Sequence, residues 1–157
     1  MIRPFRTEDA PALAAIFSAS RRAAMPWLNH AHTPEQEAAF ITGTALPRAR
    51  VWVVEAEGRP AGFLAREGDW IMHLYLDPER RRQGLGSALV EAAREDRPKV
   101  LKLHLFQRNA AARAFYEKHG FRAVGFGDGS GNMEGEPDAL YEWRAPGAPH
   151  TGSEEGE

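Results

Sequence analysis

Alternating apolar and polar positions predict three consecutive strands in the first half of the chain. Val51 to Ala56 is a run of β-branched and aromatic residues, Glu57 to Pro60 has turn-forming composition, and Ala61 to Ala65 is apolar again. A third strand over Trp70 to Leu76 should end at Asp77-Pro78, because proline cannot donate to a sheet ladder. We therefore expect a three-stranded meander.

The segment before this meander has helical spacing. Met1 to Arg6 predicts a short strand, and the apolar residues from Leu13 to Phe17, which follow the cap residue Thr7, predict an amphipathic helix. Thr33 to Gln36 combines a capping box with proline at the first helical position, so a second helix should begin there. Arg21 to His32, between the two helices, is expected to be irregular.

The second half alternates helices with strands. A helix is predicted from Gly84 to Glu95, where apolar residues share one face, and a strand over Val100 to Phe106. Asn109 is a suitable cap for the helix that comes next. Two further alternating segments, Phe121–Phe126 and Leu140–Trp143, predict a last strand pair joined by a glycine-rich, acidic loop.

Composition indicates a single globular domain. The chain has 157 residues, of which 43% are hydrophobic and 27% charged, and these values are ordinary for one soluble domain. We expect the domain over residues 1–145 and a disordered tail over 146–157, which is rich in proline, glycine and glutamate.

Charge and cysteine content narrow the function classes. A formal net charge of −2 disfavours a nucleic-acid partner. The absence of cysteine excludes disulfides, thiolate metal sites and a cysteine nucleophile, and His30 and His32 have no companion ligands, so no metal is expected. No apolar run has the length of a membrane span and no signal core begins the sequence, so no membrane partner and a cytoplasmic location are expected.

The segment from Arg81 to Ser87, with glycines at 84 and 86, lies between a predicted strand and a predicted helix. Backbone N–H groups and the helix dipole at such a position bind pyrophosphate, and arginines add positive charge. The alternative interpretation is a glycine-containing turn with solvated arginines. Leu89 occupies the place of the third glycine in a dinucleotide fingerprint, and there is no Walker A sequence, so ATP and dinucleotide folds are disfavoured.

The middle of the chain resembles the GNAT superfamily of N-acetyltransferases. The family's pyrophosphate motif is matched by Arg81, Gly84 and Gly86. Its following signature is matched at four further places: Asn109, Ala112, Phe115-Tyr116 and Gly120-Phe121. The resemblance covers about Ile2 to Trp143. It implies an α/β (α+β) fold with a mixed, mostly antiparallel sheet of six to seven strands, about four flanking helices and a splay between the two central strands.

The resemblance also implies the activity, transfer of an acetyl group from acetyl-CoA to a primary amine by direct attack in a ternary complex. Two alternatives remain open, a non-catalytic acyl-CoA sensor and a transferase for a longer acyl group. A homodimer is also consistent with the family. The residues implied in cofactor binding lie on the third strand of the meander, on the loop and helix after it, and on the Asn109 helix: Leu74, Tyr75, Leu76, Arg81, Arg82, Gln83, Gly84, Leu85, Gly86, Ser87, Asn109, Ala112, Phe115 and Tyr116.

Tyr116 occupies the family's position for the general acid. An amine that attacks a thioester expels a thiolate, and a phenol within hydrogen-bond reach can protonate it. The alternative is that Phe115 and Tyr116 only pack a helix face against the sheet.

The general base is less clear in this sequence. His73 is a candidate because histidine titrates near neutral pH, although strict alternation directs it away from Leu74 and Leu76. Trp70 and Met72, which stand where relatives have bases, cannot accept a proton. A water relayed by Glu55, His73 or His32 is a further alternative.

The amine acceptor should bind between the N-terminal helices and the last strand pair. Met25, Trp27 and His32 are the candidate acceptor-binding residues. The loop Asp128–Pro137 is acidic and would attract a cationic amine, unless its charges are simply solvated.

Overall fold

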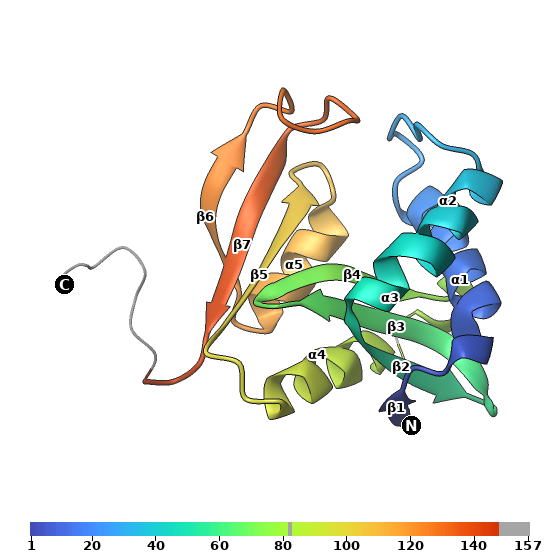
Figure 1. Cartoon of the computed structure of the whole chain (residues 1–157). Helices are drawn as coiled ribbons and strands as arrows, with labels where there is room; N and C mark the ends of the chain where they lie inside the picture. Colours follow the sequence, from blue (N-terminus) through green and yellow to red (C-terminus); the bar gives the residue numbers. More distant parts are fainter. Residues whose placement is uncertain (82, 148–157) are drawn as a thin grey trace.

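The computed structural model describes residues 1–81 and 83–147. Within this part, seven strands form one mixed sheet in the order β1-β2-β3-β4-β5-β7-β6 (Figure 1). The strands are β1 (Ile2–Pro4), β2 (Arg50–Ala56), β3 (Arg59–Glu67), β4 (Trp70–Leu76), β5 (Val100–Phe106), β6 (Arg122–Gly127) and β7 (Asp138–Arg144). All neighbouring pairs are antiparallel except β4 and β5, so the expected mixed, mostly antiparallel sheet is confirmed.

Helices cover both faces of the sheet. They are α1 (Ala10–Ala24), α2 (Pro34–Phe40), α3 (Leu46–Arg48), α4 (Leu85–Glu95) and α5 (Ala110–Lys118). A π-helical turn at Ile41–Ala45 joins α2 to α3, and 3-10 turns precede α1 and follow β4 at Thr7–Asp9 and Pro78–Arg80. Figure 1 shows α1, α2 and α3 on one face and α4 on the other.

The core is divided by the sheet into two clusters. Leu13 and Phe17 of α1 pack on Phe63 of β3, whereas Leu89 of α4 packs with Leu64 of β3 on the opposite face. This division follows from the two-residue period of a strand, which sends neighbouring side chains to opposite faces. Alternate side chains of β3 therefore pack against helices on opposite faces of the sheet.

Helix α1 is longer than expected. The sequence pattern predicts irregular structure from Arg21, but the helix continues to Ala24, so this boundary was wrong. The last turn is stabilised from outside the helix, because Arg22 forms an ion pair of 2.6 Å with Glu37 of α2. The start of α2 is confirmed: the Thr33 side chain accepts from the Gln36 backbone N–H, and Pro34 is the first helical residue.

Strands β4 and β5 separate after one point of contact. They pair only at Trp70 and Lys102 among the described residues, whereas β5 pairs with β7 along its whole length on the opposite edge. The expected splay between the two central strands is thus confirmed. A bulge adds to it: His73 is opposite Ala65 while Ile71 is opposite Arg66, so Met72 is an extra residue in β4.

Candidate active site

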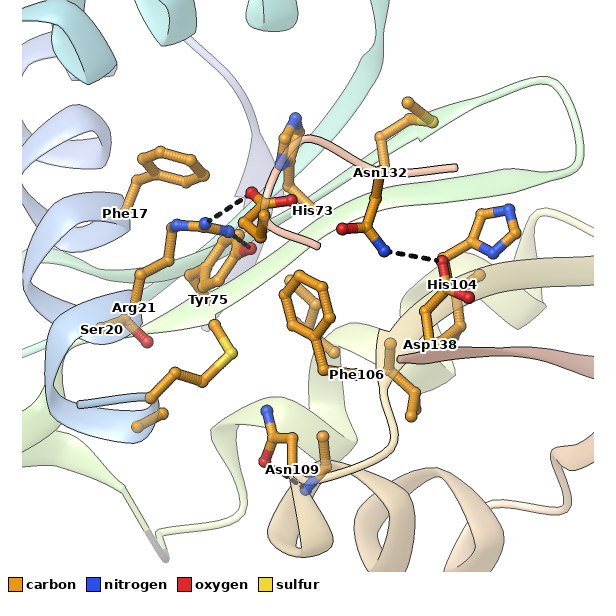
Figure 2. Close-up of a pocket in the computed structure, with 18 of the residues that line it drawn as sticks. Phe17, Ser20, Arg21, His73, Tyr75, His104, Phe106, Asn109, Asn132 and Asp138 are labelled. Atoms are coloured by element: carbon orange, nitrogen blue, oxygen red, sulfur yellow. Dashed lines mark hydrogen bonds and ion pairs between the residues drawn. The ribbon is translucent and has the colours of Figure 1, made fainter. Parts of the chain in front are cut away.

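A cavity of about 1380 Å³ occupies the opening between β4 and β5. It is lined by α1, α2, β4, the first turn of α4, β5, α5 and the loop between β6 and β7 (Figure 2). Its volume exceeds that of a typical drug-sized pocket, as expected if two substrates meet in it. We call the part near α4 and α5 the cofactor half, and the part near α1, α2, Met72 and the β6–β7 loop the acceptor half.

The cofactor half contains the free N-terminus of α4. Gly84 precedes the helix with φ of 79°, a left-handed conformation that glycine adopts without strain. The first described bond of the helix runs from Ala88 N to Gly84 O, and among the described residues no carbonyl before the helix accepts from the N–H groups of Leu85, Gly86 and Ser87. The N-terminus of α4 therefore has the features of an anion-binding site.

Gly86 also has a packing role that the sequence motif does not reveal. A Cβ at this position would lie 3.2 Å from ring atoms of Phe115 and 3.6 Å from Leu76. The missing side chain therefore lets α4 approach α5 and β4 closely. The Ser87 hydroxyl adds a hydrogen bond of 2.9 Å to His119 Nε2, at the other end of α5.

The arginines before α4 have different environments. Arg81 lines the cavity and donates from Nε to the Pro78 carbonyl at 3.3 Å. Arg80 instead forms an ion pair of 2.9 Å with Glu57. Arg82, which the resemblance assigns to cofactor binding, lies outside the described residues. Among the described residues of this segment, Arg81 is therefore the arginine that lines the cavity.

Asn109 is fixed by its own helix. Its Oδ1 accepts from the Ala112 N–H at 3.1 Å, which caps α5. Because this bond assigns the oxygen to the cap, the amide nitrogen remains as a donor, and Figure 2 shows it turned toward the cavity. Ala112, Phe115 and Tyr116 of the same helix also line the cavity.

The edge of β4 that faces β5 is open beyond Trp70. Leu74 and Leu76 pack toward α4, and Tyr75 packs toward α1. Their strand has no described partner on this side, so its backbone groups are available to an extended ligand. The cavity lining includes all three residues.

Tyr116 of α5 is buried and lines the cavity. Its ring packs edge-on against Phe115 at 5.0 Å and Phe121 at 5.3 Å. Burial raises the pKa of the phenol well above its ordinary value, with a smaller contribution from Tyr75. The hydroxyl is therefore protonated at neutral pH and is a proton donor rather than a base.

His73 faces α1, on the side of β4 opposite to Leu74 and Leu76, as the alternation along the strand predicted. Its ring lies 5.6 Å from Phe17 and 6.2 Å from Phe40, both nearly edge-on. Burial, together with the charge of Arg21, lowers the pKa of His73 to about 4. The imidazole is thus neutral at pH 7 and can accept a proton, but a group with this pKa is a weak base toward an ammonium ion.

The other base candidates differ in position. His32 lines the cavity. Glu55 is not among the described lining residues, and its carboxylate accepts from Arg3 Nε at 2.6 Å beside β1. The Glu55 carboxylate therefore pairs with Arg3 away from the cavity, and the geometry does not support its predicted role as a proton relay.

Two of the three predicted acceptor-binding residues line the cavity. Met25 and His32 line the cavity. Trp27 is outside the described lining and packs against Phe106 at 6.2 Å and beneath the Arg108 guanidinium at 4.5 Å. Its indole is held by these two contacts at the end of β5.

Sequence reasoning missed the charged centre of the acceptor half. The Arg21 guanidinium donates to the Tyr75 hydroxyl at 3.3 Å and lies 3.5 Å from the Glu134 carboxylate and 4.0 Å from Glu37 (Figure 2). Arg21 was placed in an irregular segment, and Glu37 was not singled out. No local pattern joins them, because the contacts depend on packing α1 against α2 and β4.

Residues 1–81 and 83–147 contain neither a membrane-spanning helix nor a metal-binding cluster. No helix there combines the length and apolar character required to cross a bilayer. Nor do three or more histidine and acidic side chains come together there in a way that could hold a metal ion.

Comparison with known proteins agrees with the geometry. Residues 47–123 match the model of an acetyltransferase (GNAT) domain. The peptidyl-lysine N-acetyltransferase YjaB of Salmonella typhimurium is 35% identical over 125 residues, which cover 79% of this chain and 84% of the relative.

Two solved structures extend the likeness to most of the chain. The solution structure of apo YjaB from Escherichia coli has a TM-score of 0.75 and 28% identity, and covers 91% of this chain and 96% of that one. A PaiA N-acetyltransferase from Thermoplasma acidophilum, solved in complex with coenzyme A, has a TM-score of 0.71 over 92% of this chain and 98% of that one. At 18% identity, this second likeness concerns the fold alone.

The chain belongs to the GNAT family of acetyltransferases. It is an acetyl-CoA-dependent N-acetyltransferase, as the resemblance of its motifs implied. Family membership does not assign roles to individual residues, which are proposed below on the geometry of the cavity.

Proposed function

We propose that the cofactor half binds acetyl-CoA through backbone groups more than through side chains. The N–H groups at the start of α4 would hold the pyrophosphate, with Arg81 beside them. The open edge of β4 over Leu74 to Leu76 would pair with the pantetheine arm, and the Asn109 amide nitrogen would donate to it. Acetyl-CoA supplies the activated acetyl group as a thioester.

Tyr116 acts as the general acid in this proposal. Its hydroxyl donates a proton to the leaving sulfur, and the high pKa ensures that the proton is present throughout the neutral range. The acceptor amine attacks directly, without an acylated side chain, since both halves belong to one cavity. Removal of the amine proton involves water, and the relay candidates are His32 and the neutral imidazole of His73.

The acceptor is the side-chain amine of a lysine in a peptide or protein. The single observation that carries this step is the charge of the acceptor half, where four carboxylates line the wall with one guanidinium: Glu37, Asp128, Glu134, Asp138 and Arg21. Such a wall favours a cationic amine over an anionic substrate. The name of the relative YjaB, a peptidyl-lysine N-acetyltransferase, supports the same class.

An amine panel that reads released CoA tests the proposal. Lysine peptides, free lysine, a polyamine and an aminoglycoside are compared at saturating acetyl-CoA, with Tyr116→Phe beside the unaltered protein. We expect the lysine peptides to give the highest kcat/KM and the Tyr116→Phe variant to lose most of the turnover. A preference for a non-peptide amine would reject the acceptor class and leave the acetyltransferase assignment intact.

A cytoplasmic location and a homodimer also remain proposals. The dimer is suggested by the family, and sedimentation of the purified protein would decide it.

A further inference from the structure

The carboxylates of the acceptor half are not equivalent. Glu37 accepts from the Ser18 hydroxyl and from Arg22 Nη1, each at 2.6 Å. Although burial opposes it, these two hydrogen bonds lower the pKa of Glu37. This carboxylate is therefore already satisfied, and it serves to join α1 to α2.

The two aspartates are engaged at the far wall. Asp128 is exposed and accepts from the Ser130 N–H at 2.9 Å, within its own turn. Asp138 accepts from the Asn132 amide at 3.3 Å, a bond that closes the base of the β6–β7 loop (Figure 2). Neither aspartate is therefore an enclosed carboxylate that lacks a hydrogen bond.

Glu134 differs from these three acids. Its side chain is only 17% exposed, so the loop holds it inside the cavity mouth. Its one described contact joins Oε2 to Arg21 Nη2 at 3.5 Å, which is long for a hydrogen bond, and no described contact engages Oε1. A carboxylate has room for about four hydrogen bonds, so Glu134 can bind a second cation while Arg21 stays in place.

Arg21 is itself fixed from several sides. Its guanidinium lies 5.3 Å from the Phe17 ring and donates to the Tyr75 hydroxyl. Both partners belong to the packed layer of α1 and β4. The Glu134 carboxylate is thus attached to a rigid part of the fold, although its own loop is rich in glycine.

We propose that Glu134 binds the ammonium group of the acceptor and that Arg21 is its positioning residue. The inference rests on the proposed lysine-acetylating function and concerns recognition of the amine before it loses its proton. A lysine side chain reaching past Met72 and Met133, which are exposed and line the same cavity, would bring its ammonium to this carboxylate. Glu134 is therefore a determinant of the KM for the amine.

Glu134→Gln tests the proposal because it keeps the shape of the side chain and removes its charge. We expect the KM for the amine to rise roughly five- to thirtyfold, while kcat and the KM for acetyl-CoA stay within about twofold. The KM of the unaltered protein should rise with ionic strength, and that of the variant should respond less. Glu136→Gln is the matched control: Glu136 is in the same loop but pairs with Arg108 at 3.7 Å, outside the described lining.

A double-variant cycle tests the role of Arg21. Arg21→Lys keeps the charge but loses the fork that reaches both Tyr75 and Glu134. It should raise the same KM in the unaltered background and have little further effect in the Glu134→Gln background. Additive effects would show that Arg21 acts independently of Glu134 and would overturn its positioning role.

Two acceptors separate this inference from the function on which it rests. The assays use a blocked lysine peptide and n-butylamine. An equal KM in Glu134→Gln and the unaltered protein overturns the Glu134 inference even if the peptide is a good substrate. Turnover of butylamine alone rejects the peptide function, and the KM ratio for butylamine then still decides the role of Glu134. Failure of both amines overturns both.

Discussion

Removing the hydroxyl of Tyr116 perturbs the proposed chemistry with little change to the fold. The ring packs against Phe115 and Phe121, and phenylalanine keeps both contacts. No cavity of methylene size is created, so the free energy of unfolding should change by no more than about 1.5 kcal/mol, the value of a typical hydrogen bond. Tyr116→Phe therefore isolates the proton-donating function.

The expected loss follows from the protonation state of the phenol. Because burial raises the pKa of Tyr116, the donor is fully protonated at neutral pH and its whole contribution is lost in the variant. General acids contribute roughly a hundred- to ten-thousandfold to a rate, which corresponds to about 2.7 to 5.4 kcal/mol of barrier at 1.36 kcal/mol per decade. We expect kcat to fall within this range.

Single-turnover measurements of CoA release, at saturating acetyl-CoA and lysine peptide, give the chemical step directly. Calorimetry gives the Kd for acetyl-CoA in the same samples, and it should be unchanged. An equal rate in the two proteins would show that water or another group protonates the sulfur. A Kd that rises in step with the loss of rate would make the hydroxyl a binding contact shared by ground and transition states.

Two further predictions concern Asn109 and His73. Asn109→Asp keeps the helix cap but loses the amide donor, so thermal stability should hold while calorimetry shows a roughly tenfold weaker Kd for acetyl-CoA; Asn109→Ala should in addition lose about 1 kcal/mol of stability. Unchanged affinity in Asn109→Asp would contradict the donor role. The pKa of His73 is about 4 in the fold and 6.5 in its ordinary state. The contribution of the neutral imidazole to the free energy of unfolding is therefore fully present above pH 6.5 and is lost as the pH falls toward 4. Denaturant unfolding at pH 7 and pH 4.5 should show a loss about 2 to 3 kcal/mol larger in the unaltered protein than in His73→Phe, and equal losses would refute the neutral buried histidine.

The cofactor half was predictable because its determinants are local. Gly84 marks the left-handed residue before α4, and Asn109 caps α5 through a bond to a residue three positions away. Both patterns can be read in a short window of sequence. The splay of β4 and β5 required the family resemblance in addition, since it depends on which strands pair beyond Trp70.

The acceptor half could not be predicted in the same way. Arg21 and Glu134 come from the two ends of the domain and meet only through packing of α1, β4 and the β6–β7 loop. The bulge at Met72 could not be predicted either, because it is a property of the register with β3 and not of the residues of β4 alone. The prediction for Trp27 rested on residue type and position in the sequence, which do not decide where a side chain packs. Its ring packs on Phe106, outside the described lining.

The acceptor class is tested most directly by mass spectrometry of a lysine peptide after incubation with acetyl-CoA and the protein. The proposal predicts one added acetyl group on the lysine side chain, none when that lysine is replaced by arginine, and a slower appearance of the acetylated peptide when the protein carries Tyr116→Phe. Release of CoA without acetyl on the lysine, or acetyl only on the peptide N-terminus, would contradict the proposal that this cavity transfers acetyl groups to peptidyl lysine.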